Sequence, residues 1–318
     1  MGWRTPGGRG QRPATGIRAL MRPRPAWAAW LAALLVAVAG GCATADIAAR
    51  GGASDAGPAS VETAGASFLP AAVPQGSLVV GLAEAGARVE YAGRTLRVSP
   101  DGRFVFGVGR DASGPLAIQI IRRDGQVQVH SLAVTPRDWP EERIDGVPPS
   151  TVNPPPAIAE RIKREQARVA EARLRDDARN DFAQTFIWPV QGRVSGRFGN
   201  RRVYNGEPGA AHSGMDIAAP EGVAVKAPAA GVVTFADPGL YLTGGTLLLD
   251  HGHGISSNFL HLSRLDVKVG DRVAQGQVVG AVGATGRATG PHLHWGMNWF
   301  DVRIDPLLVL ETSGAPAP

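Results

Sequence analysis

Cysteine is nearly absent from this 318-residue chain, which has a single one, Cys42. A lone cysteine excludes a disulfide-stabilised scaffold and any zinc site made of four cysteines. The length allows about two ordinary domains, and an apolar fraction of 44% is enough for each to bury a core.

Acidic residues are missing from residues 1–41, which contain six arginines. The whole chain has 33 Lys and Arg against 28 Asp and Glu, with a pI near 10.0. Such a balance would suggest nucleic acid or an anionic membrane as a partner. Without those six arginines, however, 27 basic residues face 28 acidic ones. The basic charge belongs to the amino-terminal segment, and we expect no nucleic-acid partner.

No apolar run is long enough to span a bilayer comfortably. Residues 26–39 form a run of 14 after a basic flank, which is typical of a secretory signal peptide. The run ends in Ala39-Gly40-Gly41-Cys42, which resembles the lipobox of bacterial lipoproteins, whose cysteine is lipidated. Residues 1–41 are thus predicted to be a lipoprotein-type signal peptide, with translation starting at Met1 or Met21. A plain signal peptide with Cys42 incidental is the alternative.

Lipidation at Cys42 would anchor the chain stably, because two or more acyl chains suffice for that. Ala43 follows, and not the Asp that retains many lipoproteins in the inner membrane, so the resemblance implies a periplasm-facing lipoprotein in the outer membrane of a Gram-negative cell. Residues 42–75 are predicted to form a flexible tether, since a stretch rich in Ala, Gly and Ser cannot offset its ordering entropy.

Residues 76–137 alternate short apolar runs with turn signals such as Asp101-Gly102 and Asp124-Gly125. The candidate strands are 78–80, 88–91, 95–98, 104–108, 116–120 and 127–130. The pattern predicts a small β-sandwich of six or seven strands. It carries no catalytic pattern, and it could orient a catalytic domain, occlude its cleft or contact an envelope or division protein.

Residues 138–185 combine a Pro-rich linker with a charged helix. The prolines between Pro148 and Pro156 predict a stiff extended segment. Residues 157–182 favour a helix with Glu160/Arg164 and Glu171/Arg175 as i,i+4 pairs. Because its apolar stripe is narrow, a spacer helix lying across one domain is preferred to a coiled-coil partner site.

Residues 186–310 are Gly-rich, and they hold six of the seven histidines. The candidate strands are 223–225, 231–233, 246–249, 267–269 and 278–280. Glycine at nearly every break predicts a compact antiparallel β domain with tight turns, so the whole chain is expected to be mainly β. Residues 311–318 are predicted to be a disordered tail.

Three segments of this domain point to a metal centre. His212 and Asp216 are four residues apart, and a strand starting at Met215 would turn both to one face. His292 and His294 also share a strand face. Two imidazoles and a carboxylate from distant segments are the ligands of an open zinc site with water in the fourth position. Bound zinc lowers the pKa of that water toward about 7.

Two histidines remain beside such a centre as a general base and an oxyanion donor. In Phe259-Leu260-His261-Leu262, the parity of His261 differs from that of the flanking leucines, so we expect His261 to face a cleft while the leucines pack beneath.

These segments resemble the signature of the lysostaphin and LytM type zinc endopeptidases, which cut peptidoglycan peptides. The similarity covers residues 186–310 and includes Ser195-Gly196-Arg197-Phe198-Gly199, Asp250-His251-Gly252 and Thr289-Gly290-Pro291-His292. It implies a duplicated-hybrid-motif fold with one Zn²⁺ per chain. The ligands implied are His212, Asp216 and His294, and the catalytic residues implied are His261 and His292. Phe259 stands where the family often has Tyr.

The remaining aromatic and histidine residues carry weaker expectations. Tyr204, Tyr241, Trp295 and Trp299 could line a substrate groove, although core packing is equally open for the two tryptophans. His251 and His253 are expected to be exposed in a turn.

The preferred hypothesis is a zinc endopeptidase of peptidoglycan stem peptides or cross-links, such as D-alanine to meso-diaminopimelate, acting in cell-wall remodelling or division. The first alternative is a LytM-domain regulator that activates a murein amidase by protein contact. The second is a non-haem iron oxygenase with two histidines and one carboxylate. Which bond is cut, whether the enzyme inhibits itself and its oligomeric state are not predicted.

Overall fold

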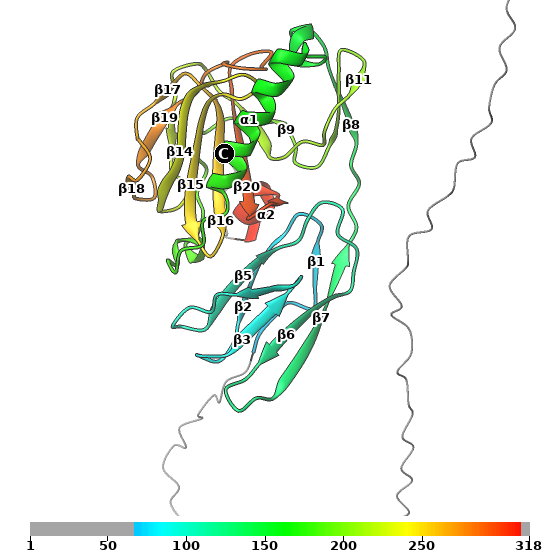
Figure 1. Ribbon diagram of the computed structural model, residues 1–318, viewed down its shortest axis with the longest axis vertical. Coiled ribbons are helices and arrows are strands. Elements are labelled where there is room, and N and C mark those ends of the chain that lie inside the picture. Colours follow the sequence, from blue (N-terminus) through cyan, green and yellow to red (C-terminus); the bar gives the residue numbers. More distant parts are fainter. Residues whose placement is uncertain (1–66, 313–318) are drawn as a thin grey trace, which may run out of the picture. The chain divides into compact units, whose positions relative to one another are not determined.

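The computed structural model describes residues 67–312, and within this range the protein is mainly β, as predicted (Figure 1). The α-helices of this range are α1 (Pro156–Ala172) and α2 (Pro306–Thr312). No helix of the described range is long and apolar enough to cross a membrane. The predicted signal peptide, the predicted lipidation site Cys42, most of the predicted tether and residues 313–318 of the predicted tail lie outside the described residues. Residues 311 and 312, also predicted to belong to that tail, are the end of α2.

The first part of the described range is a β-sandwich. Its strands are β1 (Ala72–Pro74), β2 (Leu78–Leu82), β3 (Arg88–Tyr91), β4 (Arg94–Leu96), β5 (Arg103–Gly107), β6 (Leu116–Ile121) and β7 (Val127–Thr135). One sheet has the order β1-β7-β6-β3-β4, and β2 pairs with β5 in the other. Phe104, Phe106 and Ile118 are fully buried in its core. β1 lies within the residues predicted to be a tether, so that prediction was wrong for this strand. The sequence did not reveal β1 because three residues are too few to show a periodicity.

The segment after the sandwich is joined to the C-terminal domain by backbone pairing. β8 (Glu141–Ile144) runs parallel to β10 (Arg201–Tyr204), which also pairs with β11 (Glu207–Pro208). A 3-10 turn follows at η1 (Pro149–Thr151). The first half of the predicted linker is therefore partly strand, although its prolines suggested an extended spacer.

Helix α1 lies along the large sheet of the C-terminal domain, where Val169 and Ala172 pack against Phe235 and Leu248 (Figure 1). It ends at Ala172, so the prediction of a helix to residue 182 was wrong. Contacts with the sheet, and not the local sequence, end the helix here.

Beyond the helix, Arg179 forms ion pairs with Asp177 and with Asp250, which fix the chain against the sheet. Within α1, Arg161 and Glu165 form an i,i+4 ion pair at 2.6 Å. The predicted helical pair of Glu171 and Arg175 was wrong, because Arg175 lies beyond the end of α1 and pairs with Asp177.

The C-terminal domain is built on a large sheet of order β18-β14-β15-β16-β20-β12-β9, with β21 beside β20. Its strands are β9 (Arg193–Gly196), β12 (Met215–Ala218), β14 (Gly231–Leu240), β15 (Gly244–Gly252), β16 (Ile255–Leu262), β18 (Arg272–Val273), β20 (His292–Trp299) and β21 (Val302–Ile304). A smaller sheet holds β13 (Ala224–Lys226), β19 (Val278–Ala281) and β17 (Arg264–Leu265), and a 3-10 turn, η2 (Asp181–Ala183), precedes the domain.

The predicted strand at residues 267–269 is absent. Its residues enter a turn in which the Asp271 amide donates to the Lys268 carbonyl at 3.1 Å, and the Asp271 carboxylate accepts from the Lys268 amide at 3.0 Å. A valine-rich segment thus becomes a turn because an Asp three residues on satisfies its backbone.

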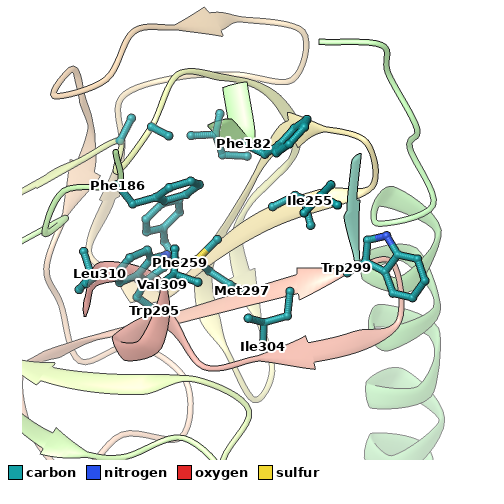
Figure 2. Close-up of a cluster of buried hydrophobic side chains, with 14 of the residues drawn as sticks. Phe182, Phe186, Ile255, Phe259, Trp295, Met297, Trp299, Ile304, Val309 and Leu310 are labelled. Atoms are coloured by element: carbon teal, nitrogen blue, oxygen red, sulfur yellow. The ribbon is translucent and has the colours of Figure 1, made fainter. Parts of the chain in front are cut away.

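Strand β20 divides its side chains between core and site. Trp295, Met297 and Trp299 project to one face and join the apolar cluster around Phe186 (Figure 2). Because the side-chain period of a strand is two, His292 and His294 project to the opposite face. The core that fixes β20 therefore also fixes the direction in which its histidines point.

Candidate metal centre and active-site cleft

Strand pairing brings Asp216 and His294 together. They are direct partners between the antiparallel strands β12 and β20, and cross-strand partners project to the same face. His212 approaches from the loop before β12 through Ser213 and Gly214. A Cβ at Gly214 would lie 2.4 Å from the Trp295 carbonyl oxygen, so only glycine permits this close approach.

Three ligand-type atoms form a nearly equilateral group at this point. His212 Nε2 lies 3.0 Å from Asp216 Oδ1 and 3.0 Å from His294 Nδ1, and His294 Nδ1 lies 2.9 Å from Asp216 Oδ1. All three residues are buried, with 5–8% of their surface exposed. The residues predicted to be ligands thus converge on one point.

The donor set fits a divalent cation. His212 Nδ1 donates to the Arg197 carbonyl at 2.9 Å, so Nε2 presents its lone pair to the group. At most one proton, on His294 Nδ1, is then available to three buried acceptor atoms. Zinc binds such atoms at about 2.0–2.2 Å, and three atoms about 3 Å apart can all reach one ion at that distance. A cation at this point satisfies the whole group.

Asp216 is held by a buried arginine that the sequence did not reveal. Arg202 Nη2 donates to Asp216 Oδ2 at 2.8 Å, and Arg202 Nε lies 3.0 Å from Glu142 Oε2 on β8. Burial alone would raise the pKa of Asp216, but its close contacts with the imidazoles of His212 and His294 outweigh burial and hold that pKa well below its ordinary value. Asp216 is therefore a carboxylate. No spacing in the sequence links Glu142 to this site, because their proximity comes from the β8–β10 pairing.

His261 reaches the cleft through a β-bulge rather than by strand parity. The register between β15 and β16 shifts where Gly245 pairs with Leu262 and Leu247 with Phe259. At the extra residue His261 has a φ of 65°, a left-handed conformation that His adopts more readily than most residues. The predicted packing of both leucines beneath His261 was wrong, because Leu262 is buried while Leu260 lines the cleft.

His261 and His292 face each other, with ring centroids 4.8 Å apart. His261 Nδ1 donates to the Thr285 carbonyl at 2.7 Å, and His292 Nδ1 donates to the Gly290 carbonyl at 2.8 Å. Their Nε2 atoms are thereby left as the basic ring nitrogens. Burial, followed by the neighbouring His292 and His294, lowers the pKa of His261 to about 3, so this imidazole is neutral at pH 7.

The five residues line a cleft of about 1200 Å³. Of the aromatic residues predicted to form a groove, Tyr204 lines this cleft. Trp299 borders the cleft too, but it is only 2% exposed and packs in the core, which was its alternative placement. Trp295 is fully buried in the core, which was its alternative placement (Figure 2). Tyr241 donates from its hydroxyl to Ser150 Oγ at 3.1 Å, and it is not among the residues lining the cleft.

The prediction that His251 and His253 are exposed was wrong. His251 is fully buried in β15, where Nδ1 donates to the Ala230 carbonyl and Nε2 accepts from the Ser257 hydroxyl, both at 2.8 Å. His253 is 4% exposed and packs on Phe182 with ring centroids 4.6 Å apart. The glycines around them suggested a loose turn, but the segment at Arg179 covers it.

The chain is similar to known proteins over the residues that form this cleft. Residues 210–306, which contain all five site residues, match the model of peptidase family M23. A crystal structure from Pseudomonas aeruginosa assigned to peptidase M23 is 32% identical and has a TM-score of 0.59, covering 74% of this chain and 94% of that one. The chain belongs to peptidase family M23.

Curated relatives of this M23 chain include proteins named for cell division and for peptidase activity. The cell division protein DipM of Caulobacter vibrioides is 31% identical over 50% of this chain and 26% of its own length. The DD-carboxypeptidase/endopeptidase Mpg of Neisseria meningitidis is 41% identical over 38% and 27%, and the peptidoglycan DD-endopeptidase ShyC of Vibrio cholerae is 41% identical over 32% and 24%. The M23 chain thus spans about a quarter of the length of these relatives.

Proposed function

We propose that this M23 chain is a zinc-dependent endopeptidase that hydrolyses peptide bonds in peptidoglycan. The observation that carries the proposal is the buried group of His212 Nε2, Asp216 Oδ1 and His294 Nδ1, with the imidazoles of His261 and His292 packed beside it. Relatives named as DD-endopeptidases support a substrate with D-amino acids on both sides of the cut bond.

In this proposal His212, Asp216 and His294 hold one zinc ion. When bound, the ion supplies Lewis-acid activation of water and of the substrate carbonyl. Arg202 fixes the Asp216 carboxylate and neutralises part of its charge.

His261 and His292 are the proton-transfer residues. The free Nε2 of one accepts a proton from the attacking water, and the resulting imidazolium returns it to the departing amine. The other imidazole, after its Nε2 takes a proton from solvent, donates a hydrogen bond to the oxyanion of the tetrahedral intermediate. The backbone carbonyls of Thr285 and Gly290 hold both rings in the orientation that this transfer needs.

The decisive experiment combines metal analysis with cleavage. The purified full chain should hold about one zinc and should release peptides from sacculi, as resolved by muropeptide chromatography. His212→Ala should lose both metal and cleavage, whereas His292→Ala should keep the metal and lose cleavage. Cleavage retained in His212→Ala would falsify the ligand assignment.

The same variants test the regulator hypothesis. A chain that acts only by contacting an amidase should restore wild-type cell morphology equally well as Asp216→Ala. All five chemical positions are present in the cleft, which favours an enzyme, and we therefore expect Asp216→Ala to fail in that assay.

We further propose that the enzyme acts in the envelope from a lipid anchor at Cys42, where the Ala39-Gly40-Gly41-Cys42 pattern supports acylation. Cys42→Ser should then move from the membrane fraction to the soluble periplasmic fraction. If the variant still sediments with outer membranes, the anchor lies elsewhere.

A further inference from the structure

Arginine dominates the charge of the cleft. Five arginines and three acidic residues line it, so it favours an anionic ligand. The arginines are Arg110, Arg143, Arg202, Arg287 and Arg303. Three of them already have carboxylate partners, which are Asp111 for Arg110, Glu141 for Arg143 and both Glu142 and Asp216 for Arg202.

The other two differ in position. Arg303 donates to Asn298 Oδ1 at 2.6 Å, and it pairs with Asn298 across β20 and β21. Asn298 is six residues along β20 from His292, which is roughly 20 Å in an extended strand. Arg287, by contrast, lies on the loop that begins after β19 and leads directly into His292. Arg287 therefore lies on the loop that leads to His292, and it lacks a carboxylate partner within the described part of the chain.

Arg287 is held in a defined orientation. Its guanidinium carbon lies 4.1 Å from the centroid of the Tyr204 ring, and Nη1 donates to the Thr151 carbonyl at 3.1 Å. Its backbone amide donates to the Leu242 carbonyl at 2.8 Å. Among the described residues, one of its five N–H donors is thus engaged. A stacked guanidinium keeps its edge available for a bidentate carboxylate.

The loop of Arg287 also carries part of the proposed proton-transfer machinery. Thr285, two residues earlier, accepts the hydrogen bond of His261 Nδ1, and its hydroxyl accepts from the Gly245 amide at 2.9 Å. His292 lies five residues after Arg287. A ligand bound at Arg287 is therefore positioned relative to both histidines by one short, hydrogen-bonded loop.

The substrate of the proposed function carries a free carboxylate next to the bond that is cut. In a D-alanyl-meso-diaminopimelate cross-link, the nitrogen that leaves is attached to a carbon that also bears a free carboxylate. An uncross-linked stem ending in D-alanyl-D-alanine has the same local arrangement. In both, hydrolysis adds hydroxyl to the D-alanine carbonyl carbon, breaks its C–N bond and returns a proton to the nitrogen.

We propose that Arg287 binds this carboxylate on the leaving side of the cut bond, and that the cleft therefore accepts both cross-links and D-alanyl-D-alanine termini. The proposal rests on the proposed function and names the specificity-determining residue of that site. It makes endopeptidase and carboxypeptidase activity two outcomes of one recognition step.

Amidated substrates provide the kinetic test. For wild type, converting the leaving-side carboxylate of a cross-linked dimer to a carboxamide should lower kcat/KM by about 10- to 100-fold, the range expected for hydrogen bonds to a charged group. Arg287→Gln should cleave both dimers with similar kcat/KM, mainly through a raised KM for the free carboxylate. Arg287→Lys should restore part of the preference as a point charge.

Arg143→Gln is the matched control. It removes the same charge from the same cleft, but the Arg143 side chain is 75% exposed and lies 3.0 Å from Glu141. The preference for the free carboxylate should persist in this variant. An Arg287→Gln enzyme that binds zinc normally and keeps the wild-type preference would overturn the assignment, as would loss of the preference in Arg143→Gln.

Binding without turnover separates this inference from the proposed function. His292→Ala, titrated calorimetrically with a stem pentapeptide ending in D-alanyl-D-alanine, should bind at least tenfold tighter than it binds the C-terminal amide. Adding Arg287→Gln should abolish that difference. A binding preference in a chain whose wild type cleaves nothing would refute the enzyme and retain the carboxylate site. Cleavage by wild type together with equal binding of both peptides would support the enzyme and refute the carboxylate site.

Discussion

The two sides of the cleft are built by different means. The metal side rests on the regular register of β12 and β20, where Asp216 and His294 are cross-strand partners above a packed core. The other side rests on a bulge at His261 and on the loop that carries Thr285 and Arg287. Regular strand pairing holds Asp216 and His294 in place with little local strain. The bulge and the loop instead direct into the cleft side chains that a regular strand would direct away from it.

The largest effect should come from breaking the metal side at Asp216. In Asp216→Ala, zinc should fall to background by elemental analysis and cleavage should disappear. The free energy of unfolding should fall by up to about 3 kcal/mol, because Arg202 keeps a buried charge with only Glu142 as partner.

Combining Asp216→Ala with Arg202→Met should recover part of that stability in denaturant titrations without recovering zinc. If the single variant still holds one zinc per chain, the register of β12 and β20 does not define the metal group.

A substitution at His261, on the bulge side of the cleft, should lower catalysis without affecting zinc binding. His261→Ala should lower kcat by about 10²- to 10⁴-fold, the usual contribution of a positioned acid or base, while zinc content stays at about one per chain. Asn adopts the left-handed conformation more readily than Ala. His261→Asn therefore serves as the backbone control and should be equally slow but more stable to heat. Zinc loss in both variants would show that the two sides are one unit.

A histidine outside the cleft sharpens the comparison through pH. Burial lowers the pKa of His251 to about 4 from an ordinary value near 6.5. As the pH falls, the His251 imidazole is therefore protonated in the unfolded chain before it is protonated in the folded chain. The free energy of unfolding should decrease by up to about 3 kcal/mol between about pH 6.5 and pH 4. In His251→Asn this part of the slope should vanish in zinc-saturated protein. An unchanged slope would mean that His251 can be protonated in the folded chain.

The smallest effect should come from helix α1, away from the cleft. Arg161 and Glu165 form an i,i+4 pair, and the Arg161 side chain is 46% exposed. Arg161→Ala should therefore cost less than about 1 kcal/mol of unfolding free energy and leave cleavage rates within twofold. A larger loss of activity would show that the helix contributes to the cleft.

The sequence predicted what depends on strand period and missed what depends on tertiary pairing. His212, Asp216, His292 and His294 could be placed because strand parity and a glycine bend set their directions. His261 was placed in the cleft by an argument that a bulge overturns. Arg202 and Glu142 were invisible, since the pairing of β8 with β10 joins residues about 60 positions apart. His251 looked exposed because the distant segment that covers it has no local signal.

The pairing of β8 with β10 bears on how the enzyme should be dissected. Sequence alone suggests cutting the catalytic piece at residue 186. Such a cut would remove Glu142, strip β10 of a neighbouring strand and take away Trp139, whose ring occupies the space beside Gly199. A recombinant fragment that starts ahead of Trp139 should retain the architecture around Asp216, whereas the shorter one should hold its metal less tightly.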